Sequence, residues 1–244
     1  MSDSGTKAPS GEQTGAQSGE QSQAQQQRVV DFFVRRRTRL GSFVDALRAA
    51  DQSAVPADTD RVIAEAEVVF RDMTRDMAYV DAPQLVMSQA LFFCMVQLAV
   101  YQVLCKQIDV HVYGAAMLDF MRHSADADEM DDEADEAETV LGPGPGTHPG
   151  EFVLEVVNAE GESFDSGYNI KSCAICYHFA RYDAMALVPY MCASDDVISD
   201  KGQQGLRRTG TIALGAQQCD FRYTRGGEPR RVAEHFPEQI RFVH

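Results

Sequence analysis

Apart from Met1, the first 27 residues lack large apolar side chains, since no Leu, Ile, Val, Phe, Tyr or Trp occurs before Arg28. Such a segment cannot bury enough apolar surface to offset the entropy of ordering it, so we expect a disordered tail over 1–27. The segment also lacks the apolar core of a secretory signal and the arginine-rich pattern of a transit peptide. We therefore expect the protein to stay in the cytoplasm.

Positive charge is scarce, because 22 Lys and Arg stand against 37 Asp and Glu, which gives a net charge of −15. Much of the excess lies in the run 126–138, DADEMDDEADEAE, which repels phosphate backbones and anionic lipid headgroups. The basic cluster of Arg35, Arg36, Arg37 and Arg39 is short and lacks repeated aromatic partners, so we interpret it as a solvated helix face. The sequence predicts neither a nucleic-acid nor a membrane partner.

Charge of either sign is absent from the 24 positions 82–105, a length that can span a membrane. Five polar residues interrupt this stretch, and no belt of Lys or Arg flanks it. A central helix covered on all sides needs the same composition, and we favour that interpretation over a membrane span.

Apolar periodicity predicts helices over 28–50, 62–77 and 110–122, besides the uncharged stretch. Residues 126–150, acidic and then rich in Gly and Pro, are expected to form a linker or insertion between a helical half, 28–125, and a mixed half, 151–244. The mixed half is expected to contain strands at 151–158, 167–170, 209–214 and 220–224, with helices at 173–182 and 187–198, the latter interrupted near Pro189. The predicted fold is α+β, with N-terminal helices followed by a small antiparallel sheet with flanking helices, and 28–244 forming one domain.

Six cysteines without an export signal indicate reduced thiols, and four of them fall between Cys173 and Cys219. Cys173 opens a predicted helix, where unpaired N–H groups and the helix dipole lower the pKa of a thiol, and Lys171 acts in the same direction. A nucleophile, a metal ligand and an ordinary buried cysteine are the interpretations open for Cys173.

Zinc is one of these alternatives. Cys173-x-x-Cys176 has the spacing of half a structural zinc site, which Cys192 and Cys219 would complete. Within a helix, positions 173 and 176 share a face and position 178 turns away, so we expect His178 on the surface.

Two further features concern the last predicted strand. Cys219 and Asp220 are neighbours in it, so their side chains should point to opposite faces of the sheet, and we expect only one of them to line a pocket. Gly215, in the turn before them, could present backbone N–H groups to an anion or simply close a hairpin.

The order of these residues resembles a known family. Cys173 opens a helix, Cys192 precedes Asp196 by four positions, and then follow Arg208-Thr209-x-Thr211, Gly215 and Cys219-Asp220-Phe221-Arg222. This pattern resembles the L-2-amino-thiazoline-4-carboxylic acid hydrolase family, over roughly 62–224. The long N-terminal tail and the 126–150 insertion depart from the family pattern.

The resemblance implies a hydrolase that opens a small heterocyclic carboxylate, converting the aminothiazoline carboxylate to N-carbamoyl-L-cysteine. Such a reaction needs a nucleophile at the ring carbon between sulfur and nitrogen, an acid for the leaving atom and a cation for the substrate carboxylate. The candidate catalytic residues are Cys173, Cys192, Asp196, Cys219 and Asp220. The candidate substrate-binding residues are Arg208, Thr209, Thr211 and Arg222.

This interpretation requires no cofactor, although zinc on the cysteines stays open. A second hypothesis is a non-catalytic small-molecule-binding or sensing domain that holds a ligand or zinc in the same place. A third is an interaction protein that uses the acidic run at 126–138.

Overall fold

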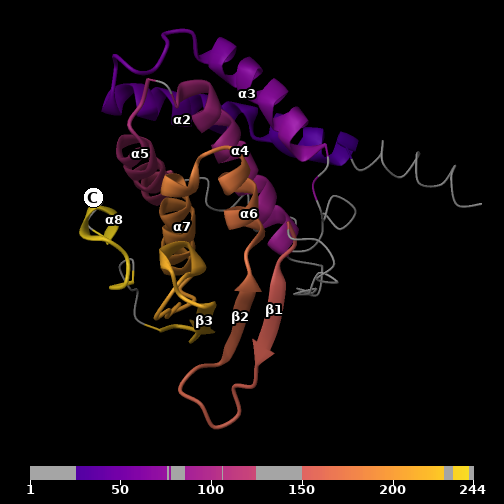
Figure 1. Ribbon diagram of the computed structural model, residues 1–244. Coiled ribbons are helices and arrows are strands. Elements are labelled where there is room, and N and C mark those ends of the chain that lie inside the picture. Colours follow the sequence, from indigo (N-terminus) through magenta and orange to yellow (C-terminus); the bar gives the residue numbers. More distant parts are fainter. Residues whose placement is uncertain are drawn as a thin grey trace, which may run out of the picture.

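The computed structural model describes residues 26–75, 77, 86–105, 107–124, 150–227 and 233–241. Some of its helices precede the first strand and others follow the second, and the helices pack over one end of a small three-stranded antiparallel sheet, as Figure 1 shows. The predicted α+β class is confirmed. The predicted tail lies outside the described residues except for 26 and 27, and so does the predicted linker except for Gly150.

The helical half begins with a helical segment over 26–35 and continues with α2 (Arg37–Ala50), α3 (Thr59–Thr74), α4 (Val86–Leu104) and α5 (Val110–His123). The single helix predicted for 28–50 is therefore wrong in one respect. Arg36 interrupts it, because its backbone lies at φ −93°, ψ 3° and its N–H bonds to the Phe33 carbonyl, three residues back. Asp58 caps α3 by accepting a hydrogen bond from the Arg61 N–H.

α4 is the helix formed by the uncharged stretch, and it passes through the middle of the helical layer (Figure 1). Its residues Met87–Leu104 are long and apolar enough to cross a membrane, and 67% of that segment is buried within the protein. Core helices of soluble proteins meet the same criterion. The burial of α4 is that of a core helix. The absence of a membrane partner stays a prediction.

The sheet has the order β1 (Val153–Val157), β2 (Ser166–Ser172), β3 (Cys219–Tyr223). Tyr168 on β2 lies opposite Phe221 on β3, and Ile170 lies opposite Cys219. Because side chains alternate along a strand, these four share one face with Tyr223. Polar residues occupy the other face, where Glu155 accepts a hydrogen bond from Asn169 at 3.1 Å and forms an ion pair with Lys171 at 3.0 Å.

The strand predicted for 209–214 is wrong. Thr209 and Gly210 form a loop, and a short 3-10 helix, η3 (Ile212–Leu214), follows it and ends at Gly215 with φ +90°. The backbone N–H groups of Thr209 and Gly210 donate to the Asp220 carboxylate, so they cannot join the sheet as ladder donors.

The remaining helices are α6 (Ala174–Arg181), the 3-10 helix η2 (Met185–Leu187), α7 (Val188–Lys201) and α8 (Glu238–Arg241). Pro189 does not interrupt α7 but lies in its first turn, where a missing N–H leaves no hydrogen bond unmade. The expectation that His178 is exposed is also wrong. α6 is covered by α4, η2 and α7, and His178 is 1% exposed.

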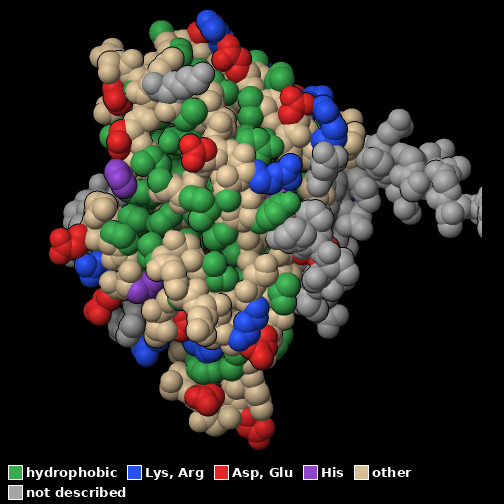
Figure 2. Space-filling model, in the orientation of Figure 1, with side chains coloured by type: hydrophobic (Ala, Val, Ile, Leu, Met, Phe, Trp, Pro, Cys, Tyr) green, Lys and Arg blue, Asp and Glu red, His purple; other side chains and the backbone are tan. Residues whose placement is uncertain are grey.

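Buried side chains from the helices and from the sheet form one continuous apolar core. Tyr190 of α7 lies directly on the backbone of Gly114 in α5, which brings these two helices close together. On the face drawn in Figure 2, hydrophobic side chains gather over the middle of the molecule and charged ones lie mainly around its edge. The core thus fixes α6 and α7 against the end of β2, where most of the predicted site residues lie.

Candidate active site

Cys173 lies at the junction where β2 ends and α6 begins, and it is the N-cap of α6 with an extended backbone, φ −110° and ψ 112°. The Cys176 thiol donates a hydrogen bond to the Cys173 sulfur, which lowers the pKa of Cys173. Burial opposes this effect, and the N–H groups of Ile175 and Cys176 at the start of the helix reinforce it. The lowered pKa predicted for Cys173 is therefore present, with Cys176 as its main cause.

Cys173 and Cys176 form a hydrogen-bonded pair of thiols whose pKa values move apart. The hydrogen bond to Cys173 raises the pKa of Cys176 strongly, and burial raises it further. When one of the two thiols ionises, it is therefore Cys173, and Cys176 keeps its proton. Both cysteines are free and half-buried, so solvent and small reagents can reach them.

Three more cysteines lie close enough to Cys173 for its charge to raise their pKa values, namely Cys94 of α4, Cys192 of α7 and Cys219 of β3. We call the five residues Cys94, Cys173, Cys176, Cys192 and Cys219 the thiol cluster. Burial raises the pKa of Cys94 and Cys192 well above the ordinary value, and it raises the pKa of Cys219 to about 11. Within the cluster, Cys173 is the member whose environment favours the thiolate.

The thiol cluster does not have the arrangement of a metal site. Over the residues that the structure describes, no group of three or more His, Cys, Asp or Glu side chains converges as metal ligands would. The Cys219 sulfur instead accepts the Ile212 N–H at 3.3 Å and so ties η3 to β3.

Arg208 is buried beside the cluster, with 1% of its side chain exposed, and is held by two carboxylates of α7. Its Nη1 donates to Asp195 Oδ2 at 2.9 Å, and its Nη2 donates to Asp196 and, at 2.7 Å, to the Cys192 carbonyl. The guanidinium also lies 4.9 Å from the centre of the Phe221 ring and 5.4 Å from that of Phe236. These contacts fix both aspartates relative to the sheet.

Asp195 is the more accessible of the two acids, with 38% of its side chain exposed against 3% for Asp196. Burial by the surrounding protein nevertheless raises the pKa of Asp195 to about 6, against the opposing effect of Arg208, and the Asp196 charge adds to the rise. The charge of Asp195 also raises the pKa of Cys94, Cys173, Cys192 and Cys219, so Asp195 lies near the thiol cluster.

Comparison with known proteins identifies the family to which these residues belong. The family model described as L-2-amino-thiazoline-4-carboxylic acid hydrolase matches residues 78–223, more than half of the chain. The chain belongs to this family. No curated protein and no solved structure matches the chain.

The segment matched by the L-2-amino-thiazoline-4-carboxylic acid hydrolase model contains the whole thiol cluster, Asp195 and Arg208. The chain completes the surroundings of these residues from outside that segment. Phe236 lies beyond the end of that segment and contacts the Arg208 guanidinium. Burial raises the pKa of Asp196, and a hydrogen bond from the Ala233 backbone partly opposes this rise. The hydrolase family thus accounts for the centre of the site, and the C-terminal residues 233–241 cover one side of it.

Asp220 and Thr209, both predicted as site residues, form a structural loop contact. The Asp220 carboxylate accepts hydrogen bonds from the Thr209 N–H at 2.9 Å, from its hydroxyl at 2.6 Å and from the Gly210 N–H at 2.9 Å. Burial acts to raise the pKa of Asp220, but these bonds outweigh it and lower the pKa. As strand alternation predicts, Asp220 and Cys219 point to opposite faces of β3.

Arg222 lies on the polar face of the sheet, opposite to the face that carries Cys219 and Phe221. Its Nη1 donates to the Tyr168 and Phe221 carbonyls, and its Nη2 donates to Asn169 Oδ1 at 3.0 Å. Thr211 is fully buried, and its hydroxyl has no hydrogen-bond partner among the described residues. The structure therefore brings together Cys173, Cys192, Cys219, Asp196 and Arg208, and it places Asp220, Thr209 and Arg222 away from them.

Sequence reasoning missed Asp195, the role of Cys176 as a hydrogen-bond donor, and two tyrosines. Tyr168 and Tyr223 lie with their hydroxyl oxygens 3.4 Å apart, and the Asp195 charge acts on both. Burial raises the pKa of Tyr223 to about 12, so its phenol stays a proton donor. Asp195 had a sequence indication, because it follows Cys192 by three positions and so shares a helix face with it, as Asp196 does at four.

Proposed function

We propose that this chain is a hydrolase that opens the ring of L-2-amino-thiazoline-4-carboxylate to give N-carbamoyl-L-cysteine, with Cys173 as the nucleophile and Asp195 as the acid and base. The observation that carries the proposal is that Cys173, whose thiolate is favoured by the Cys176 hydrogen bond, lies close enough to Asp195 for their charges to interact. Cys173 holds its charge through Cys176 and the start of α6, and Asp195 has a pKa of about 6. A carboxyl group of that pKa both donates and accepts protons near neutral pH.

The first step joins the Cys173 sulfur to the ring carbon that lies between sulfur and nitrogen. As the adduct collapses, the bond from that carbon to the ring sulfur breaks and its electron pair goes to the ring sulfur. Asp195, in its acid form, gives this sulfur its proton. The product of the step is an isothiourea attached to Cys173, with a free thiol on the former ring.

The second step releases the product and restores the enzyme. Asp195, now a carboxylate, takes a proton from water as the water oxygen attacks the same carbon. The bond to Cys173 then breaks and its electron pair returns to the sulfur, while a proton moves from oxygen to nitrogen to complete the urea group. One water molecule is added to the substrate overall.

Arg208 supports this chemistry as a positioning residue. The predicted role of Arg208, binding the substrate carboxylate, has competition, because its guanidinium already has two carboxylate partners within the protein, Asp195 and Asp196. We therefore assign Arg208 to fixing Asp195 toward the thiol cluster, and its Nη1 bond to Asp195 supports that role. The phenols of Tyr168 and Tyr223, on the same side of the sheet as Cys219, are donors suited to a charge that develops on the substrate.

The test follows N-carbamoyl-L-cysteine by mass spectrometry after incubation of the purified protein with L-2-amino-thiazoline-4-carboxylate. We expect turnover by the natural chain and by Cys105→Ala, a control cysteine outside the thiol cluster. Cys173→Ala and Asp195→Asn should each lose about 100-fold or more of kcat. An acid-quenched reaction should contain protein heavier by one substrate molecule, and this adduct should be absent from Cys173→Ala.

Two results would contradict the proposal in different ways. Full activity of Cys173→Ala would show that Cys173 is not the nucleophile and that another group carries out the hydrolysis. Saturable binding of the thiazoline without any product would favour the second hypothesis, a binding or sensing domain.

A further inference from the structure

The start of α6 places two half-buried cysteines three positions apart. Cys173 is the N-cap, with an extended backbone, and its carbonyl accepts the first hydrogen bond of the helix, from the Tyr177 N–H at 3.2 Å. Cys176 occupies the third position of the helix. An N-cap side chain turns back over the first turn of its helix, toward that third residue. The two sulfurs therefore meet, and the Cys176 thiol donates a hydrogen bond to Cys173.

The other members of the thiol cluster are more deeply enclosed. Cys94, Cys192 and Cys219 are 4%, 9% and 4% exposed, and each comes from a different element of the packed core. A disulfide between one of them and Cys173 would need those elements to move until the geometry of the bond is met. Cys176 lies on the same helical turn as Cys173, so rotation of two side chains is enough. Cys176 is thus the natural disulfide partner of Cys173.

This arrangement is that of a redox-sensing pair. Cysteines that sense oxidants combine thiolate character, access to solvent and a second thiol close enough to resolve the oxidised sulfur. Cys173 has the first two properties and Cys176 supplies the third. The chain carries a net charge of −15, and Asp195 lies near the pair, so anionic oxidants are repelled. A small neutral oxidant such as hydrogen peroxide is the reagent that this environment admits.

From these features we infer that Cys173 and Cys176 are a redox modification site, which hydrogen peroxide converts to a reversible disulfide. In the first step the Cys173 sulfur attacks one peroxide oxygen, the O–O bond breaks, and the leaving hydroxide takes a proton from solvent. In the second step the Cys176 sulfur attacks the sulfenic acid on Cys173. The S–O bond breaks, and the leaving hydroxide takes the Cys176 proton. The two sulfurs lose two electrons in all, and the peroxide becomes two water molecules.

The disulfide would also switch off hydrolysis, because Cys173 would no longer carry a free thiolate. This consequence rests on the proposed function, whereas formation of the disulfide does not. A reducing thiol such as dithiothreitol returns both sulfurs to the reduced state by thiol–disulfide exchange. The pair would thus make the activity depend on the peroxide level around the protein.

The test treats the reduced full chain with hydrogen peroxide, blocks the remaining thiols with iodoacetamide and maps the tryptic peptides by mass spectrometry without reduction. Trypsin cuts after Lys171 and Arg181, so both cysteines leave on the one peptide 172–181. We expect this peptide to lack two hydrogen atoms and to take up no iodoacetamide. Dithiothreitol added before the block should restore its alkylation at both cysteines, and Cys105→Ala should behave as the natural chain does.

Cys176→Ser is the matched variant, because it keeps a hydrogen-bond donor beside Cys173 and removes the resolving sulfur. Its peptide should contain no disulfide. The sulfenic acid on Cys173 should persist instead, so that dimedone captures it, and further peroxide should carry it to a sulfinic acid that dithiothreitol does not reverse. The natural chain should give little dimedone adduct.

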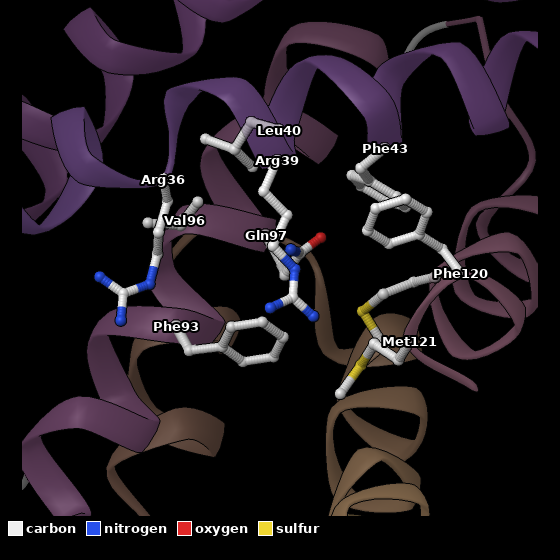
Figure 3. A pocket seen from close by; sticks show the side chains of 10 residues that line it. Arg36, Arg39, Leu40, Phe43, Phe93, Val96, Gln97, Phe120 and Met121 are labelled. Carbon is white, nitrogen blue, oxygen red and sulfur yellow. The ribbon is translucent and has the colours of Figure 1, made fainter. Parts of the chain in front are cut away.

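Two methionines report on the dose of peroxide and on the fold, because peroxide converts accessible methionine to its sulfoxide. Met185 is 39% exposed and shows that the oxidant has reached the surface. Met121 is 7% exposed and lines a small recess between α2, α4 and α5 (Figure 3), so its oxidation would show that the fold has opened. We expect the disulfide to form before the sulfoxide of Met185, with Met121 unchanged.

Turnover of the thiazoline, measured on the same samples, separates this inference from the proposed function. The oxidised natural chain should lose about tenfold or more of kcat and recover it with dithiothreitol. A disulfide in a chain that never turns over the thiazoline would contradict the proposed function and leave the redox site in place. The redox site is overturned if peptide 172–181 stays fully alkylated at a dose that oxidises Met185, or if Cys173 is found joined to a cysteine other than Cys176.

Discussion

The Nη1 atom of Arg208 lies 2.9 Å from Oδ2 of Asp195, and this contact joins a buried guanidinium to a carboxylate that solvent can reach. Arg208 is almost fully enclosed, whereas more than a third of the Asp195 side chain is exposed. Two carboxylates share the one guanidinium, so the buried group retains a net negative charge when both are ionised. Burial is the main reason why Asp195 takes up a proton more readily than an ordinary aspartate, and the excess negative charge adds to it.

The raised pKa of Asp195 predicts how stability depends on pH. The folded chain binds a proton at Asp195 up to about pH 6, whereas the unfolded chain releases it near pH 4, so ionisation of Asp195 lowers the free energy of unfolding as pH rises between these values. The expected contribution is about 1 kcal/mol, since the exposed fraction of the side chain screens part of the shift. Asp195→Asn should lack this component in urea unfolding curves recorded from pH 4 to 7, and identical pH profiles for both proteins would refute it.

The Cys176 hydrogen bond predicts a specific reactivity for Cys173. Alkylation by iodoacetamide should modify Cys173 first, with a midpoint in its pH profile below that of an ordinary thiol. Cys176→Ala removes the donor and should shift the midpoint upward, whereas Cys105→Ala should not. Peptide mass mapping identifies the modified cysteine, and an unshifted midpoint in Cys176→Ala would show that the helix start alone sets the reactivity.

Much of the fold follows from local patterns in the sequence, and the errors occur where tertiary contacts decide. Amphipathic spacing located α3, whose apolar positions recur at helical intervals. The segment 209–214 has strand-forming composition, but Asp220 takes its N–H groups and turns it into a loop. No local pattern shows that a carboxylate eleven residues away will compete for those donors.

The site shows the same division. The position of Cys173 at a helix start was predictable, because a strand followed by a helical pattern is local information. The choice between Asp195 and Asp196 was not, since both lie on one helix face near Cys192 and differ by how deeply each is enclosed. Likewise, the placement of Arg222 on the polar face depends on the register of β3 against β2.

Asp220 offers a test that separates structure from catalysis. Its hydrogen bonds hold the loop at Thr209 and Gly210, so Asp220→Asn should lower the free energy of unfolding by about 1–3 kcal/mol. Since the side chain points away from the thiol cluster, kcat of the remaining folded protein should change less than threefold. Thermal unfolding and turnover measured on the same sample check both halves, and a large loss of kcat without a loss of stability would restore Asp220 as a catalytic residue.

Substitution by alanine is expected to have opposite effects on stability at two glycines, Gly114 in the contact between α5 and α7 and Gly41 in α2. A Cβ added at Gly114 would overlap the Tyr190 ring, which is itself held by a hydrogen bond of 2.8 Å between its hydroxyl and His111 Nδ1. Gly114→Ala should therefore lower the free energy of unfolding by about 1–3 kcal/mol, because the ring cannot move aside without separating the helices. Gly41→Ala, in α2, meets no atom closer than 3.8 Å and should raise it by about 0.5–1 kcal/mol through helix propensity. Thermal unfolding of the pair checks the prediction, and since α7 carries Cys192 and Asp195, turnover of Gly114→Ala should fall together with its stability.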